Sequence, residues 1–346
     1  MYLGGGTPTL LPGGEVAALL ALVRERFGIA DGAEVTIESN PGPDERGDAR
    51  ALAEAGVTRI SLGAQSFDSG LLARLGRRHR PGDVAAAVDE ARAAGIGSVS
   101  LDLLYDVPGQ ALEDWAETLE QALGLAPDHL SAYALTLDDP DAEGLTGPLG
   151  DHLPTRAGAR RWREAAVREQ DDDRAAAEYA LAVERLGAAG YRGYEISNWA
   201  RPGHESRHNL GYWHRRPHEA VGPGAHAFDG LTRRWNAARL DGYLAALTPG
   251  GTASATMPGG GMSAPSFPPG GAETVDEATA AAEAVILGLR LDTGLSLDEA
   301  RAGPLAPHLD WALRIGLLAR FAGPQPRVRL TMRGRLLSNE LFSRLL

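Results

Sequence analysis

The chain has 346 residues, of which 23% are charged and 43% hydrophobic, and its formal net charge is -12. It contains no cysteine and no lysine, so all 34 basic residues are arginine. The missing cysteines exclude disulfide bonds, a thiolate nucleophile and the usual thiolate ligands of zinc or of an iron–sulfur cluster within this sequence. The missing lysines exclude a phosphate-loop lysine and a Schiff base.

The acidic charge balance argues against nonspecific binding to nucleic acid or to an anionic membrane, because both require a basic surface. No stretch is long and apolar enough to span a bilayer, and residues 1–30 lack the charged start and apolar run of a signal peptide. We therefore expect a cytoplasmic protein with no transmembrane segment and no nucleic-acid partner.

The first 137 residues alternate between helical and strand patterns. The patterns predict helices over Glu15–Phe27, Asp44–Ala55, Pro81–Ala94 and Ala111–Leu123, and strands over Val35–Glu38, Arg59–Gly63, Ser98–Leu103 and His129–Leu135. Repeated strand–helix units with short apolar strands predict a parallel sheet covered by helices, which places the chain in the α/β class.

Three polar residues lie at or just past the carboxyl ends of successive predicted strands: Glu38, Gln65 and Asp102. Polar groups that gather along this edge are typical of the functional face of a (β/α) barrel. An open doubly wound sheet also binds ligands at that edge, but mostly at one switch point. We therefore favour a partial (β/α) barrel.

The chain divides by composition into four parts. Residues 1–150 are expected to form the barrel core, and residues 151–247 to complete it with a helical stretch and a Gly- and aromatic-rich segment. Residues 248–274 are rich in Gly, Pro and Ser and read as a flexible linker. Residues 275–346 are expected to form a small helical unit with a hairpin near Val328–Leu330, compatible with a winged helix.

A run of three glycines and a threonine, Gly4 to Thr7, stands near the start of the chain. Glycines allow a ligand to approach bare backbone, and the threonine can donate a hydroxyl. The run has neither the GxGxxG spacing of a dinucleotide site nor the lysine of a phosphate loop. By itself it is more often an ordinary turn.

The glycine run is followed by other motifs in a fixed order. They are Glu38-Ser39-Asn40-Pro41, Gly63-Ala64-Gln65-Ser66-Phe67, Leu75-Gly76-Arg77-Arg78-His79 on the next expected helix, the segment from Asp102 to Gln110, Ser206 to Trp213, and the tail from Leu330 to Phe342. Together they resemble radical S-adenosylmethionine (SAM) proteins of the coproporphyrinogen-oxidase type. The last two motifs resemble the heme-chaperone branch of that family.

The resemblance implies a SAM site. Its residues would be Gly5, Gly6, Thr7, Glu38, Gln65, Arg77 and Asp102. The glycines and the threonine would line the methionyl group, and Glu38 would accept from the amino group or the ribose. Gln65 and Asp102 would bond the ribose side, and Arg77 would pair with the ligand carboxylate. Taken singly, the two acids could instead cap helices, and Arg77 beside Arg78 could be a solvated helix face.

Five of the nine histidines fall within one short segment: His204, His208, His214, His218 and His226. Each could be a hydrogen-bonded structural residue or, as neutral imidazole, a ligand of heme iron. The surrounding Pro and Gly argue against a helix at His204 and His208. The resemblance makes His208, within the Arg-His-Asn-Leu motif, the preferred heme contact.

The sequence departs from the family at its start. Family members carry a CxxxCxxC loop whose thiolates hold a [4Fe-4S] cluster, and this sequence has no such loop, no metal ligand and no catalytic residue of that kind. Ser206 replaces a usual cysteine, and Asp106 replaces a usual glycine. A barrel without its first strand would leave the strand at Val35–Glu38 with an unpaired edge. We expect that the true start codon lies upstream of Met1, with a truncated remnant as the alternative.

The resemblance implies a heme chaperone that binds heme and transfers it to acceptor proteins, associated with SAM and a [4Fe-4S] cluster when full length. One alternative is an oxygen-independent coproporphyrinogen III oxidase, a radical SAM enzyme of porphyrin biosynthesis. Another is an inactive binding module without a cluster.

Overall fold

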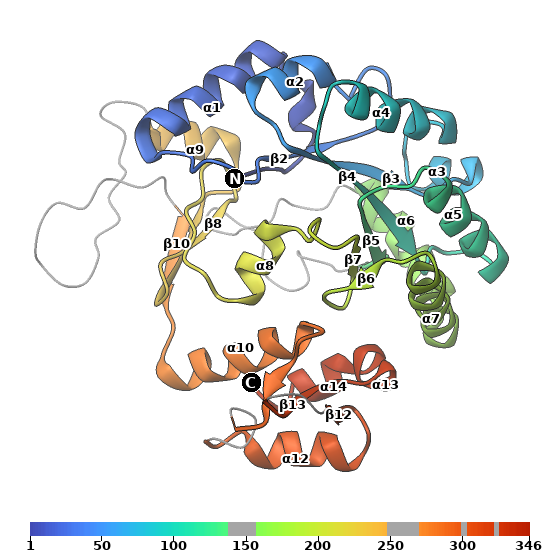
Figure 1. Ribbon diagram of the computed structural model, residues 1–346, viewed down its shortest axis with the longest axis vertical. Helices are drawn as coiled ribbons and strands as arrows, with labels where there is room; N and C mark the ends of the chain where they lie inside the picture. Colours follow the sequence, from blue (N-terminus) through green and yellow to red (C-terminus); the bar gives the residue numbers. More distant parts are fainter. Residues whose placement is uncertain (138–156, 248–269, 299–302, 322–324) are drawn as a thin grey trace, which may run out of the picture.

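The computed structural model describes residues 1–137, 157–247, 270–298, 303–321 and 325–346 (Figure 1). Its main sheet has the strand order β1-β2-β3-β4-β5-β7-β6. The strands are β1 Tyr2–Leu3, β2 Thr36–Ser39, β3 Arg59–Gln65, β4 Ser98–Tyr105, β5 His129–Ala134, β6 Arg192–Gly193 and β7 Asn198–Ala200. Strands β1 to β5 pair in parallel, and β7 and β6 pair antiparallel at the other end.

The five parallel strands are neighbours in chain order, with no reversal among them. Right-handed connections between such strands keep all the crossover helices on one face. These helices are α1 Gly13–Phe27, α2 Ala49–Ala55, α4 Pro81–Ala93 and α5 Leu112–Gly124, and Figure 1 shows them along the outside of the sheet. The α/β class and the partial barrel are therefore confirmed, and the doubly wound alternative is wrong.

The two faces of the sheet have opposite chemistry. Ile60, Leu62 and Val99 point outward and are almost fully buried in the core formed with the helices. Their strand neighbours Ser61 and Asp102 point inward, away from that core. Because successive strand residues alternate between faces, an apolar outer face leaves a separate polar inner face.

Most predicted elements of the first half lie within two residues of the observed bounds at each end. The helix predicted over Asp44–Ala55 is an exception, because it begins only at Ala49. Asp48 is its N-cap and accepts from the backbone N–H of Arg50 at 2.9 Å and of Ala51 at 3.1 Å. A further short helix, α3 Ser69–Arg74, ends before Arg77, so this arginine lies in a loop and not on a helix.

Beyond β5 the described chain resumes with α6 Ala157–Ala166, a 3-10 turn at Val167–Glu169 and α7 Asp172–Ala188. The expectation of no helix around His208 is wrong, since Arg207–Trp213 forms α8. Ser206 caps this helix and accepts from Asn209 N at 3.3 Å. The cap and a run of seven residues without proline outweigh the Pro and Gly nearby.

A small antiparallel sheet contains β8 His226–Phe228, β9 Thr232–Asn236 and β10 Gly270–Thr274, with α9 Leu240–Leu247 following β9. Strand β10 corrects the expected linker over 248–274, whose remaining residues, 248–269, lie outside the described part. Gly271 lies against Trp235 so closely that a Cβ would come within 2.1 Å of the indole. Glycine at this position therefore allows β10 to pair with β9, whereas the composition of the segment indicated a linker.

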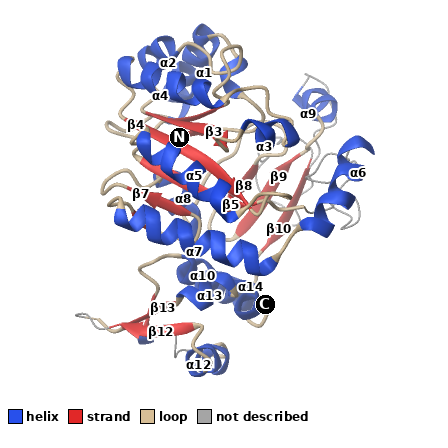
Figure 2. Ribbon diagram, turned by 90° about the vertical axis from the view of Figure 1, so that its right-hand side faces the viewer, coloured by secondary structure: helices blue, strands red, loops and turns tan. Residues whose placement is uncertain are grey.

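The C-terminal unit has its own core, built around Leu309, Val328 and Leu341. Its elements are α10 Glu277–Arg290, β11 Leu295–Ser296, α12 Ala306–Arg314, β12 Leu318–Phe321, β13 Arg327–Leu330, α13 Met332–Leu336 and α14 Ser338–Phe342. The predicted hairpin is present, as β12 pairs antiparallel with β13. Figure 2 shows this unit below the main sheet. The backbone N–H of Asp292 donates to the carbonyl oxygen of Tyr194, the residue after β6, at 3.0 Å.

Among the described residues, no helix combines the length and the apolar character needed to cross a membrane.

Trp115 of α5 joins two outer helices in the core. It is fully buried, and its indole N–H donates to Glu178 O of α7 at 2.8 Å. We predict that Trp115→Ala lowers the free energy of unfolding in urea by about 3–5 kcal/mol, because it leaves a cavity and removes the buried hydrogen bond to Glu178. Trp162→Ala on α6, whose residue is 38% exposed, is the control and should change it by less than about 0.5 kcal/mol. Equal losses in the two variants would contradict the assigned core.

Candidate functional site

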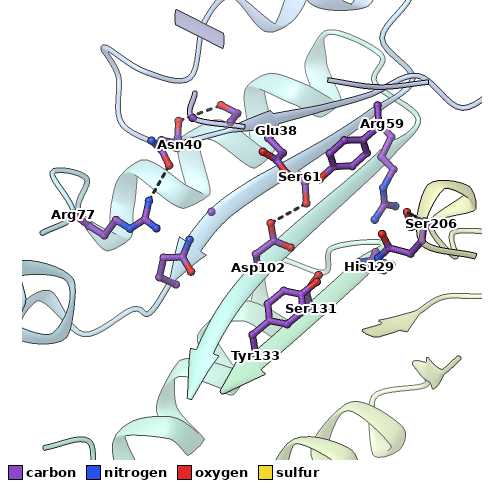
Figure 3. Close-up of a pocket in the computed structure, with 16 residues that line it drawn as sticks. Glu38, Asn40, Arg59, Ser61, Arg77, Asp102, His129, Ser131, Tyr133 and Ser206 are labelled. Atoms are coloured by element: carbon purple, nitrogen blue, oxygen red, sulfur yellow. Dashed lines mark hydrogen bonds between the residues drawn. The ribbon is translucent and has the colours of Figure 1, made fainter. Parts of the chain in front are cut away.

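The inner face of the main sheet lines a polar cavity of about 320 Å³ (Figure 3). This volume is at the lower end of the roughly 300–1,000 Å³ typical of small-molecule sites. Its strand-borne lining residues include Tyr2, Glu38, Arg59, Ser61, Gly63, Gln65, Asp102, His129, Ser131 and Tyr133. Neighbouring parallel strands thus deliver carboxylates, hydroxyls and a guanidinium to one enclosed space.

Glu38, near the carboxyl end of β2, is held by the start of the chain. Its Oε1 accepts from the Tyr2 hydroxyl at 2.5 Å, and its Oε2 accepts from Gly5 N at 2.9 Å. Burial and the bond to Glu38 raise the pKa of Tyr2, so the phenol stays protonated and donates. At Gly4 a Cβ would lie 2.6 Å from the Tyr2 ring, so only glycine allows this approach.

Gln65 reaches the cavity because β3 is irregular. The register with β4 shifts between Leu62 and Gln65, and Gln65 has a φ of 62°. A bulge of this kind redirects a side chain, and such strained residues gather at functional sites. A Cβ at Gly63 would come within 2.8 Å of the Gln65 amide nitrogen, so this glycine leaves room for the amide.

Arg77 enters the cavity from the loop after α3. One of its N–H groups donates to Asn40 Oδ1 at 3.1 Å, while Asn40 Nδ2 donates to Thr7 Oγ1 at 2.9 Å. Burial lowers the pKa of this guanidinium from its usual value. No described carboxylate forms an ion pair with Arg77, so its remaining donors are available to an anionic ligand.

Asp102 lies in the middle of the cavity wall and within β4, slightly before the strand end where it was expected. Ser61 donates to its Oδ2 at 2.9 Å. Burial raises the pKa of Asp102, whereas hydrogen bonds from Ser131 and Ser61 and the charge of Arg59 act in the opposite direction. Neither Asp102 nor Glu38 caps a described helix, so that alternative is wrong for both.

A second group of polar residues closes the other end of the cavity. Arg59 is 3% exposed and donates to Ser98 Oγ at 3.0 Å and His204 O at 3.2 Å. His129 lies between the hydroxyls of Ser100 and Tyr194, at 2.7 and 2.9 Å. Burial lowers the pKa of His129 well below its usual range, so the ring is neutral. Figure 3 shows Arg59 and Arg77 at opposite ends of the labelled residues.

His208 lies outside this cavity on α8. Its ring stacks on Tyr2 with centroids 4.2 Å apart and meets the Tyr212 ring edge-on at 4.5 Å. Burial lowers the pKa of His208 to about 4, and the nearby chain terminus adds to this effect, while Glu34 opposes it. The imidazole is therefore neutral at pH 7.

The structure brings five of the expected SAM residues to the cavity: Gly6, Glu38, Gln65, Arg77 and Asp102. Gly5 and Thr7 adjoin it through their bonds to Glu38 and Asn40. Sequence reasoning missed Tyr2, Asn40, Arg59, Ser61, His129, Ser131 and Tyr133. Arg59, Ser61, His129, Ser131 and Tyr133 could have been found from the sequence, because polar and apolar positions alternate every two residues in β3 and β5.

The residues of this chain do not fit an iron–sulfur cluster. The sequence has no cysteine, and no three acidic, histidine or cysteine residues of the described part come together in a way that could hold a metal ion. We therefore assign no reaction step that depends on an iron–sulfur cluster to this cavity.

Residues 1–122 match the radical SAM superfamily. The heme chaperone HemW of Mycobacterium tuberculosis is 40% identical over 346 residues, which cover all of this chain and 80% of that protein. The heme chaperone HemW of Bacillus subtilis is 31% identical over 350 residues, covering 99% of this chain and 84% of that protein.

Among solved structures, the coproporphyrinogen III oxidase HemN of Escherichia coli superposes with a TM-score of 0.77 at 22% identity, covering 99% of this chain and 76% of that one. This likeness shows a shared fold. The identities of 40% and 31% to the two chaperones extend over nearly the whole of this chain and show the family as well. The chain belongs to the HemW family of radical SAM proteins.

Proposed function

We propose that the chain binds SAM in the cavity of the main sheet and serves as a heme chaperone that passes heme to acceptor proteins. The observation that supports this most is the separation of charges in the cavity, with Glu38 and Arg77 supplied by different elements. SAM carries an ammonium, a carboxylate and ribose hydroxyls at separate points, and each requires a different partner.

The proposed SAM contacts follow from the free donors and acceptors. Arg77 would pair with the ligand carboxylate, because a planar guanidinium matches a carboxylate and only one described bond, to Asn40, occupies it. Glu38 would accept from the amino group or the ribose, and Gln65 and Asp102 would bond the ribose side. Gly5, Gly6 and Thr7 would offer backbone and hydroxyl to the methionyl group. An iron–sulfur cluster beside the SAM would need ligands from outside this sequence.

The proposal of a heme cargo rests on the relatives named heme chaperones and on His208. This histidine is neutral at pH 7, and no described residue hydrogen-bonds its ring nitrogens. A neutral imidazole on an aromatic surface is suited to a porphyrin contact. The fold of the oxidase is shared, but its identity of 22% carries no activity to this chain.

Arg77→Ala is predicted to weaken SAM binding about 10- to 100-fold, because it removes a hydrogen bond between charged groups. Arg78→Ala is the matched control, because Arg78 is exposed and does not line the cavity. The dissociation constant of this variant for SAM should stay within about 2-fold of the wild-type value. Isothermal titration with SAM measures both. Equal affinities in the two variants would place the ligand elsewhere.

Asp102→Asn is predicted to stabilise the protein at pH 7 and to weaken SAM binding about 10-fold, since it removes a buried charge together with a ribose acceptor. The folded-state pKa of Asp102 is raised. The free energy of unfolding of the wild type therefore falls as the pH rises from the pKa of Asp102 in the unfolded chain to its pKa in the folded protein. The advantage of the variant should grow over that window and then level off.

Urea unfolding between pH 4 and pH 8 measures this effect. Asp89→Asn, at an exposed position on α4, is the control and should show no such pH-dependent advantage. A destabilised Asp102→Asn at pH 7 would mean that hydrogen bonds from its neighbours fully compensate the buried carboxylate, and would contradict the raised pKa of Asp102.

The cargo is tested with heme itself. Adding heme to the protein is predicted to shift and sharpen the main absorption band of heme to a 1:1 end point. An unshifted band would refute the chaperone proposal. A form of the protein that carries the CxxxCxxC loop separates the two activities, because consumption of coproporphyrinogen III by that form under anaerobic conditions would support the oxidase.

A further inference from the structure

A second cavity, of about 230 Å³, is lined by residues of α8, the strands β8 and β9, the helix α10 and the loop after α8. It shares no lining residue with the cavity of the main sheet. Its walls are largely apolar and aromatic, with Tyr212, Phe228 and Leu287 among them. Such a cavity favours a ligand with an apolar surface.

His218 faces this cavity with a defined tautomer. Its Nδ1 lies 3.1 Å from the carbonyl oxygen of Arg216. A carbonyl can only accept, so Nδ1 carries the proton, and Nε2 of that tautomer has a free lone pair. No described residue hydrogen-bonds that Nε2. A backbone carbonyl on one nitrogen that leaves the other free is the usual arrangement of a metal-binding histidine.

The position of His218 is fixed by its neighbours. Its backbone exchanges two hydrogen bonds with Phe228, at 2.7 and 2.9 Å. Its ring meets the Tyr212 ring edge-on with centroids 4.8 Å apart, and the Tyr212 ring also meets the His208 ring edge-on at 4.5 Å. The aromatic run from His208 through Tyr212 to His218 therefore connects the proposed heme contact to this cavity.

The rim of the cavity is positively charged. Arg215 lies 3.2 Å from Glu283 and also over the Phe228 ring at 5.2 Å. Arg233 pairs with the same Glu283. Arg216 is exposed, and no described carboxylate pairs with it. Arg233 also lies 3.8 Å from Glu273, so Arg216 is the lining guanidinium that no described carboxylate neutralises, and it favours an anionic ligand.

We propose that this second cavity receives one edge of the heme, with His218 Nε2 as the axial ligand of the iron and Arg216 paired with a propionate. The inference rests on the proposed heme cargo and assigns the iron bond to His218, leaving His208 as a contact across Tyr212. Because the cavity is smaller than a whole porphyrin site, part of the ring lies outside it. Partial enclosure suits a protein that must release its cargo.

The test compares heme titrations of the full chain and three alanine variants, with thermal melts to confirm folding. His218→Ala should raise the Kd for heme at least about 10-fold and abolish the absorption band of the ligated iron. His218→Gly should regain that band when free imidazole is added. Arg216→Ala should weaken binding without moving the band. His214→Ala, an exposed histidine of the same segment, is the control and should bind as the wild type does.

A measurement on the wild-type protein avoids any folding defect of the variants. Diethylpyrocarbonate labelling read by mass spectrometry should modify His218 in the free protein and spare it when heme is present, with His214 labelled in both. A wild type that binds no heme would refute the proposed cargo and this inference with it. A wild type that binds heme, with an unchanged band in His218→Ala and no protection of His218, would overturn the inference alone.

Discussion

Burial of the outer face of β3, β4 and β5 against the helices determines where every other side chain of these strands lies. Leu62, Leu101 and Leu130 are fully buried on that face. The residues between them must point to the opposite side, because a strand alternates its side chains. A slip of one residue would bury Asp102 among leucines and expose the core, so the register is strongly fixed. The cavity is a direct consequence of the packing.

The polar groups that line the cavity lose hydration when the protein folds, and a bound ligand can supply new hydrogen bonds to them. Buried polar groups cost stability unless hydrogen bonds compensate them, and Glu38, Asp102, Arg59 and Arg77 all line this cavity. Their described bonds satisfy part of this requirement: hydroxyls bond the two acids, and an amide bonds Arg77. Arg77 keeps donors that no described residue occupies, and it lines the cavity together with Glu38 and Asp102. A ligand with several separate polar groups would satisfy them at once, which links the fold to the proposed SAM site.

Much of this architecture was predictable from the sequence. Periodicity located the parallel strands, and Glu38, Gln65 and Asp102 pointed to the edge where the cavity lies. The role of Asn40 was not accessible, because it depends on bringing Thr7 and Arg77 to the same place from distant segments. Helix α8 was missed because the cap by Ser206 acts locally, whereas proline and glycine dominate the composition around it. Strand β10 was missed because it pairs with a distant strand, β9. The alternation in β5 was visible in the sequence, but it was read only as a strand signal.

A crystal structure of the protein grown with SAM tests the central claim most directly. The account predicts electron density for the ligand against the inner face of the main sheet, with its carboxylate at Arg77, its amino group toward the Glu38 side and its ribose near Asp102. Density for SAM at another surface, or a cavity that contains only water at saturating ligand, would contradict it.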